Sequence, residues 1–173
     1  QKFAAIISES GSRFDDHLGV FYSTETLELS EYFELHSYNG KVLNPDPEKG
    51  GRRSPLIAAF RRKEGSPIFY VVSVHFSRSN SAARCMEAFL LREWILDQDL
   101  PVIIAGDWNF DYNFTAPTPG NPAFHIFTFE NTIYWIEPEV LIDTNYSQPG
   151  GKETYPDSIL DFICAYSLPE NWH

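Results

Sequence analysis

The chain has 173 residues, of which 43% are hydrophobic and 16% aromatic, and its formal net charge is −11. This length and apolar content predict a single folded domain over 1–173 and exclude a chain that is disordered as a whole. The negative charge argues against tight non-specific binding to duplex nucleic acid, because such binding rests on lysine and arginine contacts to phosphates. It leaves open an enzyme that acts on phosphates through a cation and one local basic patch.

The apolar runs and the two cysteines of the chain say less about its function. No apolar run is long enough for a membrane span and no signal peptide is visible, but the chain begins with Gln1, so the sequence predicts no compartment. It predicts no oligomeric state either. The two cysteines, Cys85 and Cys164, fall in a predicted helix and an apolar strand, which favours two buried thiols over a disulfide.

In chain order, the first part of the sequence predicts mainly strands. Short apolar or alternating runs are separated by turn residues, and the stretch 38–51 is predicted as loop because it contains Asn-Gly, Asn-Pro-Asp-Pro and Gly-Gly. The predicted strands cover 3–8, 18–24, 27–35, 55–62 and 68–76.

A helix is predicted over 81–96, with Asn80 or Ser81 as its N-cap. With the strands 68–76 and 101–106 it forms a strand–helix–strand unit. After a stretch rich in proline and aromatic residues over 115–138, the last predicted strand covers 158–166. The apolar face of the helix is expected to carry Ala82, Cys85, Met86, Phe89 and Ile95, with Arg84, Glu87 and Arg92 elsewhere.

The segment 101–111, Pro-Val-Ile-Ile-Ala-Gly-Asp-Trp-Asn-Phe-Asp, carries the strongest chemical signal. Its apolar run predicts a strand buried on both faces that ends at Gly106. Asp107 and Asn109 are two residues apart, so on an extended backbone they point the same way from the mouth of a sheet. A carboxylate can hold a hard cation or orient a water, and an amide can donate to a phosphate oxygen. The alternative is a loop in which both side chains bond their own backbone.

Three other polar residues lie at strand ends or inside apolar strands. His75 ends a predicted strand and can act as an acid, a base or a phosphate donor; the alternative is a hydrogen-bonded core histidine. Arg53 precedes a strand and presents a fork suited to phosphate, although a surface arginine beside a loop is common. Asp161 lies in an apolar strand. Burial of an unpaired carboxylate there costs on the order of several kcal/mol of free energy, so a histidine or cation partner is expected.

Four motifs in fixed order resemble those of the endonuclease/exonuclease/phosphatase superfamily. They are Arg-Arg-Ser-Pro before a strand, Val-Val-Ser-Val-His-Phe, a helix leading to Ile-Ala-Gly-Asp-Trp-Asn-Phe, and Ser-Ile-Leu-Asp-Phe-Ile. This superfamily includes pancreatic-type (deoxyribonuclease I-like) nucleases, abasic-site endonucleases and inositol polyphosphate or sphingomyelin phosphodiesterases. Residues 106–109 match the family's Gly-Asp-Phe-Asn signature with Trp for Phe, and the resemblance covers 52–162.

The resemblance implies a four-layer α/β/β/α sandwich with two mixed sheets and hydrolysis of a phosphodiester or phosphomonoester by an activated water. It implies a divalent cation, usually Mg²⁺ and otherwise Mn²⁺ or Ca²⁺, with Asp107 as a ligand that also orients or deprotonates the water. Asn109 and Arg53 would bind phosphate oxygens, and His75 would contact the scissile phosphate and assist proton transfer. Asp161 matches the carboxylate that orients a catalytic histidine.

Family motifs near both ends are missing. The family begins with a strand carrying Asn and a strand ending in Gln-Glu, whose glutamate is the principal metal ligand, and it ends with Ser-Asp-His. Glu9 follows the wrong strand, and His173 has no Ser-Asp before it. The resemblance therefore implies a partial domain with open sheet edges: a fragment, a site completed by other residues or another chain, or an inactive protein.

Two hypotheses about function follow. The first is a metal-dependent phosphoesterase, either a nuclease or a small-molecule phosphatase, whose substrate is a nucleic acid or a small phosphorylated molecule. The second is a catalytically inactive domain of the same fold that binds a partner through an aromatic-rich surface. Those aromatic residues are more simply explained as a packed lid or core; they are Phe124, Phe127, Phe129, Tyr134 and Trp135.

Overall fold

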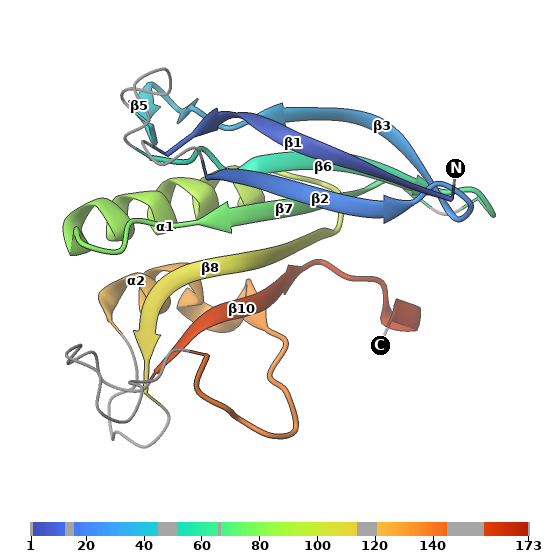
Figure 1. Ribbon diagram of the computed structural model, residues 1–173. Helices are drawn as coiled ribbons and strands as arrows, with labels where there is room; N and C mark the ends of the chain where they lie inside the picture. Colours follow the sequence, from blue (N-terminus) through green and yellow to red (C-terminus); the bar gives the residue numbers. More distant parts are fainter. Residues whose placement is uncertain are drawn as a thin grey trace, which may run out of the picture.

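The computed structural model describes residues 2–12, 16–44, 52–65, 67–113, 121–144 and 158–172 (Figure 1). These residues form one six-stranded sheet, two sheets of two strands each, two α-helices and two short 3₁₀ helices. The strands are β1 (Phe3–Gly11), β2 (His17–Ser23), β3 (Leu27–Glu34), β4 (Ser37–Tyr38), β5 (Lys41–Val42), β6 (Leu56–Arg62), β7 (Phe69–His75), β8 (Val102–Tyr112), β9 (Tyr134–Trp135) and β10 (Ile159–Tyr166). The helices are α1 (Ser81–Leu96), α2 (Pro122–Phe127), η2 (Phe129–Asn131) and η3 (Glu170–Trp172).

The six-stranded sheet places β7 and β8 side by side in parallel. Its order is β3-β6-β7-β8-β10-β9, and the other neighbouring pairs are antiparallel. Helix α1 is the crossover that a parallel pair requires, so the predicted strand–helix–strand unit is confirmed. The register runs from Tyr70 opposite Val102 to His75 opposite Asp107. The carboxyl end of β7 therefore lies beside Asp107, in the middle of β8.

Two apolar clusters lie on opposite faces of this sheet. The first packs α1 and α2 against β7, β8 and β10, and the second packs the β1–β2 hairpin against β6 and β7. Successive side chains of a strand point to opposite faces, which is why Ile57 belongs to the first cluster and Leu56 and Ala58 to the second. The described residues thus form three layers: helices, the six-stranded sheet, and the β1–β2 hairpin.

The predicted α/β fold class is confirmed: a mixed sheet has helices packed against it. The implied four-layer arrangement with two mixed sheets is reproduced in part. Within the described ranges only the six-stranded sheet is mixed, and β1–β2 is purely antiparallel. The short strands β4 and β5 lie inside the stretch 38–51 that was predicted as loop, and residues 45–51 of that stretch lie outside the described residues.

Helix α1 has the predicted bounds, and the Asn80 side chain caps it by accepting a hydrogen bond from Ala83 N. The predicted buried face is correct at Ile95 and otherwise wrong. Met86 and Phe89 are 45% and 37% exposed, whereas Arg84 and Glu87 are buried. The cause is the preceding loop, because both charged side chains hydrogen-bond groups of that loop and so turn inward. The buried positions are Ala83, Arg84, Glu87, Ala88, Leu90, Leu91, Trp94 and Ile95.

Strand β8 is longer than the predicted strand 101–106. It continues to Tyr112, because β10 pairs with it along its length, from Tyr166 opposite Val102 to Ile159 opposite Tyr112. Gly106 therefore lies inside the strand, and the signature 106–109 belongs to a paired strand with an irregular register rather than to the loop after it.

The two cysteines do not form a disulfide. Cys85 and Cys164 are both free thiols, as predicted; Cys164 is buried, which raises its pKa to about 12, while Cys85 is only partly buried. Within the described ranges, none of the helices is both long and apolar enough to cross a membrane.

The aromatic residues after β8 pack mainly into the core. Phe127 is fully buried and its ring lies 4.6 Å from that of Trp108, centroid to centroid, while Phe129 is 58% exposed. The interpretation of this stretch as part of the core is thus supported for Phe127, whereas Phe129 lies on the surface.

Replacing Phe127 by alanine is expected to lower the free energy of unfolding by about 3–5 kcal/mol, the usual range for an aromatic side chain removed from a core. Phe129→Ala is the matched control, since this exposed ring lies 5.7 Å from the Arg92 guanidinium and should lose at most about 1 kcal/mol. Urea unfolding of both variants measures the difference. Equal losses would contradict the packing described here.

Candidate active site

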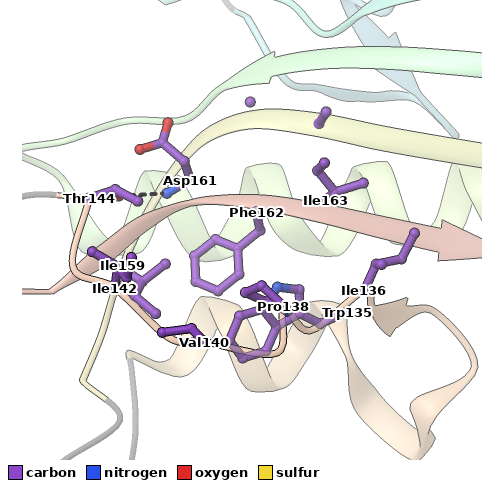
Figure 2. A pocket seen from close by; sticks show the side chains of 12 residues that line it. Trp135, Ile136, Pro138, Val140, Ile142, Thr144, Ile159, Asp161, Phe162 and Ile163 are labelled. Carbon is purple, nitrogen blue, oxygen red and sulfur yellow. Dashed lines mark hydrogen bonds between the residues drawn. The ribbon is translucent and has the colours of Figure 1, made fainter.

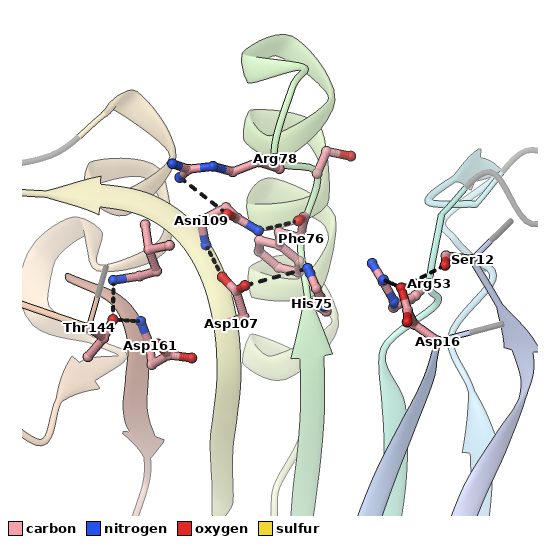
Figure 3. A network of polar contacts seen from close by, with 12 residues as sticks. Ser12, Asp16, Arg53, His75, Phe76, Arg78, Asp107, Asn109, Thr144 and Asp161 are labelled. Carbon is pink, nitrogen blue, oxygen red and sulfur yellow. Dashed lines mark hydrogen bonds and ion pairs between the residues drawn. The ribbon is translucent and has the colours of Figure 1, made fainter. Parts of the chain in front are cut away.

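Four of the predicted site residues lie in a row along one edge of the large sheet (Figure 3). His75 ends β7 and faces Asp107 of β8, which in turn faces Asp161 of β10. Arg53 comes just before β6, on the far side of β7. Positions 75, 107 and 161 come together because the parallel β7–β8 register and the antiparallel β8–β10 register meet at Asp107.

Asp107 is the half-buried carboxylate at the middle of this row. Its Oδ1 accepts a hydrogen bond of 3.0 Å from Asn109 N, and its Oδ2 lies 3.5 Å from His75 Nε2. Burial raises the pKa of Asp107, and the nearby Asp161 acts in the same direction, while His75 and the Asn109 amide oppose the shift. The result is a carboxylate that is oriented by one backbone amide and has one oxygen toward an imidazole.

The surroundings of His75 favour its neutral form. Burial lowers its pKa and the positive charge of Arg53 adds to this, while Asp107 opposes the shift. A neutral imidazole can exchange a proton with a nearby oxygen near neutral pH. The 3.5 Å contact with Asp107 is longer than a normal hydrogen bond, as is common for acid–base pairs in the absence of ligand.

Gly106 allows β7 and β8 to meet at this register. Its φ is +147°, and a Cβ built there would lie 2.0 Å from the carbonyl oxygen of Val74. No side chain fits at that distance, so only glycine can occupy this position of the signature. Trp108 then points to the other face, where it is fully buried and donates from Nε1 to Phe162 O at 3.1 Å.

The sequence analysis predicted that Asn109 points the same way as Asp107, and the structure differs. Its φ is +51°, which breaks the strand alternation, and the residue is 1% exposed. Its Nδ2 donates to Phe76 O at 2.9 Å, and its Oδ1 accepts from Arg78 Nη1 at 3.3 Å. Asn109 thus links β8 to the segment after β7 and orients Asp107 through its backbone, and its predicted bond to a phosphate oxygen stays a prediction.

Asp161 was expected to be buried and to need a partner, and that expectation is wrong. The residue is exposed, because the described residues leave this side of β10 open to solvent. Its backbone N donates to Thr144 Oγ1 at 3.2 Å. Figure 2 shows Asp161 among the residues around an apolar pocket of about 470 Å³, which also include Val140, Phe162 and Ile163.

Arg53 is anchored by a residue that the sequence analysis did not single out. Its Nη2 lies 2.5 Å from Asp16 Oδ2, and its side chain is 14% exposed. The pKa of Asp16 is lowered by its hydrogen bond from Ser12 and by Arg53. Asp16 comes from the β1–β2 connection, so a contact between distant segments positions the arginine, and local sequence carries no signal for it.

Arg78 was also missed by sequence reasoning. It follows His75 by three residues in the β7–α1 connection, where it contacts Asn109 and forms an ion pair of 2.5 Å with Asp111 Oδ1. Its position directly after a strand that carries a candidate catalytic histidine could have identified it. A cleft of about 230 Å³ is lined by Arg52, Arg53, His75 and residues 76–80; we call it the arginine cleft.

The described residues offer two neighbouring carboxylates to a cation. No group of three or more histidine, cysteine, aspartate or glutamate side chains within the described ranges is arranged to hold a metal. Mg²⁺ usually keeps several waters and binds through one or two carboxylates plus substrate phosphates, so Asp107 and Asp161 suit this ion in chemical type. They do not suit a zinc ion enclosed by protein ligands.

The electrostatics of the row can be tested by titrating His75 in metal-free solution. Its pKa is expected below 6.5 in the intact protein, lower still in Asp107→Asn, and higher in Arg53→Gln, because these charges act in opposite directions. Since the folded-state pKa is lower than the unfolded-state value, this histidine reduces stability as the pH falls below 6.5. Histidine NMR titrations measure the pKa of His75 in each variant, with exposed Asp99→Asn as control. If Asp107→Asn and Arg53→Gln changed this pKa in the same direction and by the same amount, the arrangement would be contradicted.

Comparison with known proteins gives a clear result at the level of structure only. No protein-family model and no curated protein sequence matches the chain. Among solved structures, an endonuclease/exonuclease/phosphatase family protein from Bacteroides thetaiotaomicron is similar with a TM-score of 0.67 at 17% identity. The mannosyl-6-phosphatase of the same organism has a TM-score of 0.64 at 18% identity, and the human Nocturnin catalytic domain with bound sulfate 0.66 at 14%.

These alignments cover 96% of this chain but only 61%, 63% and 61% of the three other chains, respectively. The chain thus spans less than two thirds of the length of the structures that it matches. At such low identity the likeness concerns the fold alone. We conclude that the chain has the α/β fold of endonuclease/exonuclease/phosphatase proteins.

Proposed function

We propose that this chain carries the catalytic edge of a phosphoester hydrolase. The observation that supports this most strongly is the half-buried cross-strand pair of His75, which ends β7, and Asp107, which lies within β8, with Arg53 nearby. Several fold neighbours are described as phosphatases, and the Nocturnin structure has a bound sulfate, an anion of phosphate-like shape. Both facts agree with chemistry on a phosphate ester.

The proposed roles follow from charge and position. Asp107 orients a water for attack and accepts its proton, for which a raised pKa is favourable because the carboxylate then binds a proton more strongly. Neutral His75 lies next to it, takes over that proton from Asp107 and, as imidazolium, delivers it to the leaving-group oxygen. Arg53 neutralises phosphate charge, and Asn109 keeps Asp107 in place.

Asp107 and Asp161 are the residues that would hold a divalent cation, with Mg²⁺ preferred and Mn²⁺ or Ca²⁺ as substitutes. Such an ion supplies positive charge at a phosphoryl oxygen. Asp161 is exposed and so accessible to a hydrated ion. Its second proposed role, the orientation of a catalytic histidine, requires a histidine outside the described part of the site.

The alternative, an inactive domain that binds a partner, draws less support from the structure than from the sequence. Its proposed contact surface was the aromatic stretch, but Phe127 is fully buried, and Phe124 packs against Phe110, Tyr112 and Phe162. Hydrolysis is therefore the better-supported function. The substrate is proposed to be a phosphate ester, either in a small molecule or in a nucleic acid.

Activity should depend on the His75–Asp107 pair. In the protein that contains this chain, Asp107→Asn and His75→Gln are each expected to lower kcat for a chromogenic phosphodiester or phosphomonoester about 10²–10⁴-fold, the usual contribution of an acid–base group. Asp99→Asn and His125→Gln remove the same groups at exposed positions away from the row and should leave kcat unchanged. Equal rates in all five proteins would favour the binding-module alternative.

Binding of the cation is predicted separately. Calorimetric titration with Mg²⁺ should show one saturable site whose affinity falls in Asp107→Asn and in Asp161→Asn, because each variant removes one carboxylate oxygen donor. Asp99→Asn again serves as the control for net charge. If Mg²⁺ binds equally well to all variants, then the ion does not bind at this edge.

A further inference from the structure

The arginine cleft is lined by basic side chains, although the chain as a whole is acidic. The chain carries a net charge of −11, yet this cleft is lined by three arginines and His75, and none of its described lining residues is acidic. In Figure 3, Arg53 lies beyond His75 on the side away from Asp107, whereas Arg78 lies above Asn109. A local concentration of guanidinium groups in an acidic protein indicates a binding site for an anion.

Each arginine is held in place by a carboxylate that does not itself line the cleft. Arg53 pairs with Asp16 at 2.5 Å, and Arg78 pairs with Asp111 at 2.5 Å. These contacts restrict the side chains before any ligand arrives, which lowers the entropic cost of binding.

Arg52 is positioned in the same way by a buried group. Its Nε lies 3.8 Å from Oε1 of Glu87, whose side chain is 6% exposed. Glu87 is fixed in turn by hydrogen bonds from the backbone N and the hydroxyl of Ser77, at 2.9 and 2.8 Å. This explains why a glutamate of α1 is buried: it connects the cleft wall to the helix.

Arg53 also has donor capacity left over. Its Nε is buried and has no hydrogen-bond partner among the described residues. A buried donor without an acceptor is unfavourable, and an oxygen of a bound anion would satisfy it. Because Arg53 lines the cleft, this spare donor agrees with an anionic ligand there.

Charge changes sign along the edge of the sheet. Asp161 and Asp107 lie on one side of His75, and Arg53 with its partner Asp16 lies on the other (Figure 3). His75 lines the cleft, so a phosphate ester that reacts between His75 and Asp107 would have the cleft beside it. Only a ligand with an additional negative group would use both parts.

We propose that the arginine cleft binds a second phosphate group of a small substrate, one that is not cleaved, while the scissile phosphate lies at the His75–Asp107 pair. The inference rests on the proposed hydrolase function and specifies its substrate class: small molecules with two phosphate groups. The cleft volume of about 230 Å³ is large enough for one phosphate group. The acidic surface around it opposes a long polyanion.

The test measures binding without catalysis. Calorimetry in metal-free buffer compares propane-1,3-diol bisphosphate with propyl phosphate, using the intact protein. The bisphosphate is expected to bind at least about tenfold more tightly, the size of effect that one added charge-assisted contact gives. Arg52→Gln should remove this preference and leave the affinity for propyl phosphate unchanged.

Arg61→Gln is the matched control, because it removes the same charge from the exposed far end of β6 and should keep the preference. If Arg52→Gln does not fold because Glu87 loses a partner, Arg52→Lys keeps the charge and should show a reduced preference. Equal binding of the two probes by the intact protein, or a preference that survives in the Arg52 variant that folds, overturns the proposal.

A third probe, a single-stranded tetranucleotide, distinguishes the source of the second phosphate. Weaker binding than the bisphosphate supports a small-molecule substrate, and tighter binding overturns it in favour of a nucleic acid strand. These results do not depend on turnover. If the protein prefers the bisphosphate but hydrolyses nothing, the cleft proposal stands and the hydrolase proposal fails. If it hydrolyses phosphate esters but shows no preference for the bisphosphate, only the cleft proposal fails.

Discussion

The close approach of Gly106 to the Val74 carbonyl is the constraint on which the candidate site depends. A side chain at this position would lie within 2.0 Å of that oxygen, so the parallel register of β7 and β8 exists only with glycine there. That register places His75 opposite Asp107. It also leaves Trp108 on the opposite face, where its burial and its bond to Phe162 O secure β8 against β10. One backbone contact thus links core packing to site geometry.

Burial shifts the pKa values of Asp107 and His75 in opposite directions. It raises the pKa of Asp107 and lowers that of His75, so both changes disfavour the charged pair and favour the neutral one. Their mutual attraction works against this, as does the Asn109 amide on Asp107. Two groups whose proton affinities are brought closer together can exchange a proton at little cost, which is the property that acid–base chemistry requires.

Sequence patterns predicted those features that depend on neighbouring residues. The bounds of α1, its Asn80 cap and the strand–helix–strand unit follow from periodicity and capping chemistry. The arginine cleft was not predicted, because the contacts of Arg53 with Asp16 and of Arg78 with Asp111 join distant segments. The exposure of Asp161 was missed for a related reason: its strand is apolar, but how much of its surface is covered depends on other layers of the fold.

The described residues leave one side of β10 open, so the electrostatics of the site depend on any layer that packs against this side. Asp161 and Ile163 lie on the same face of the strand, and Ile163 is 50% exposed. An exposed isoleucine gains by being covered, whereas an exposed carboxylate loses its hydration unless the covering group brings a positive charge or a donor. Covering would also lower the local dielectric constant, which strengthens the repulsion between Asp161 and Asp107 that already raises the pKa of Asp107. A layer compatible with both residues must therefore be apolar over Ile163 and cationic or hydrogen-bonding over Asp161.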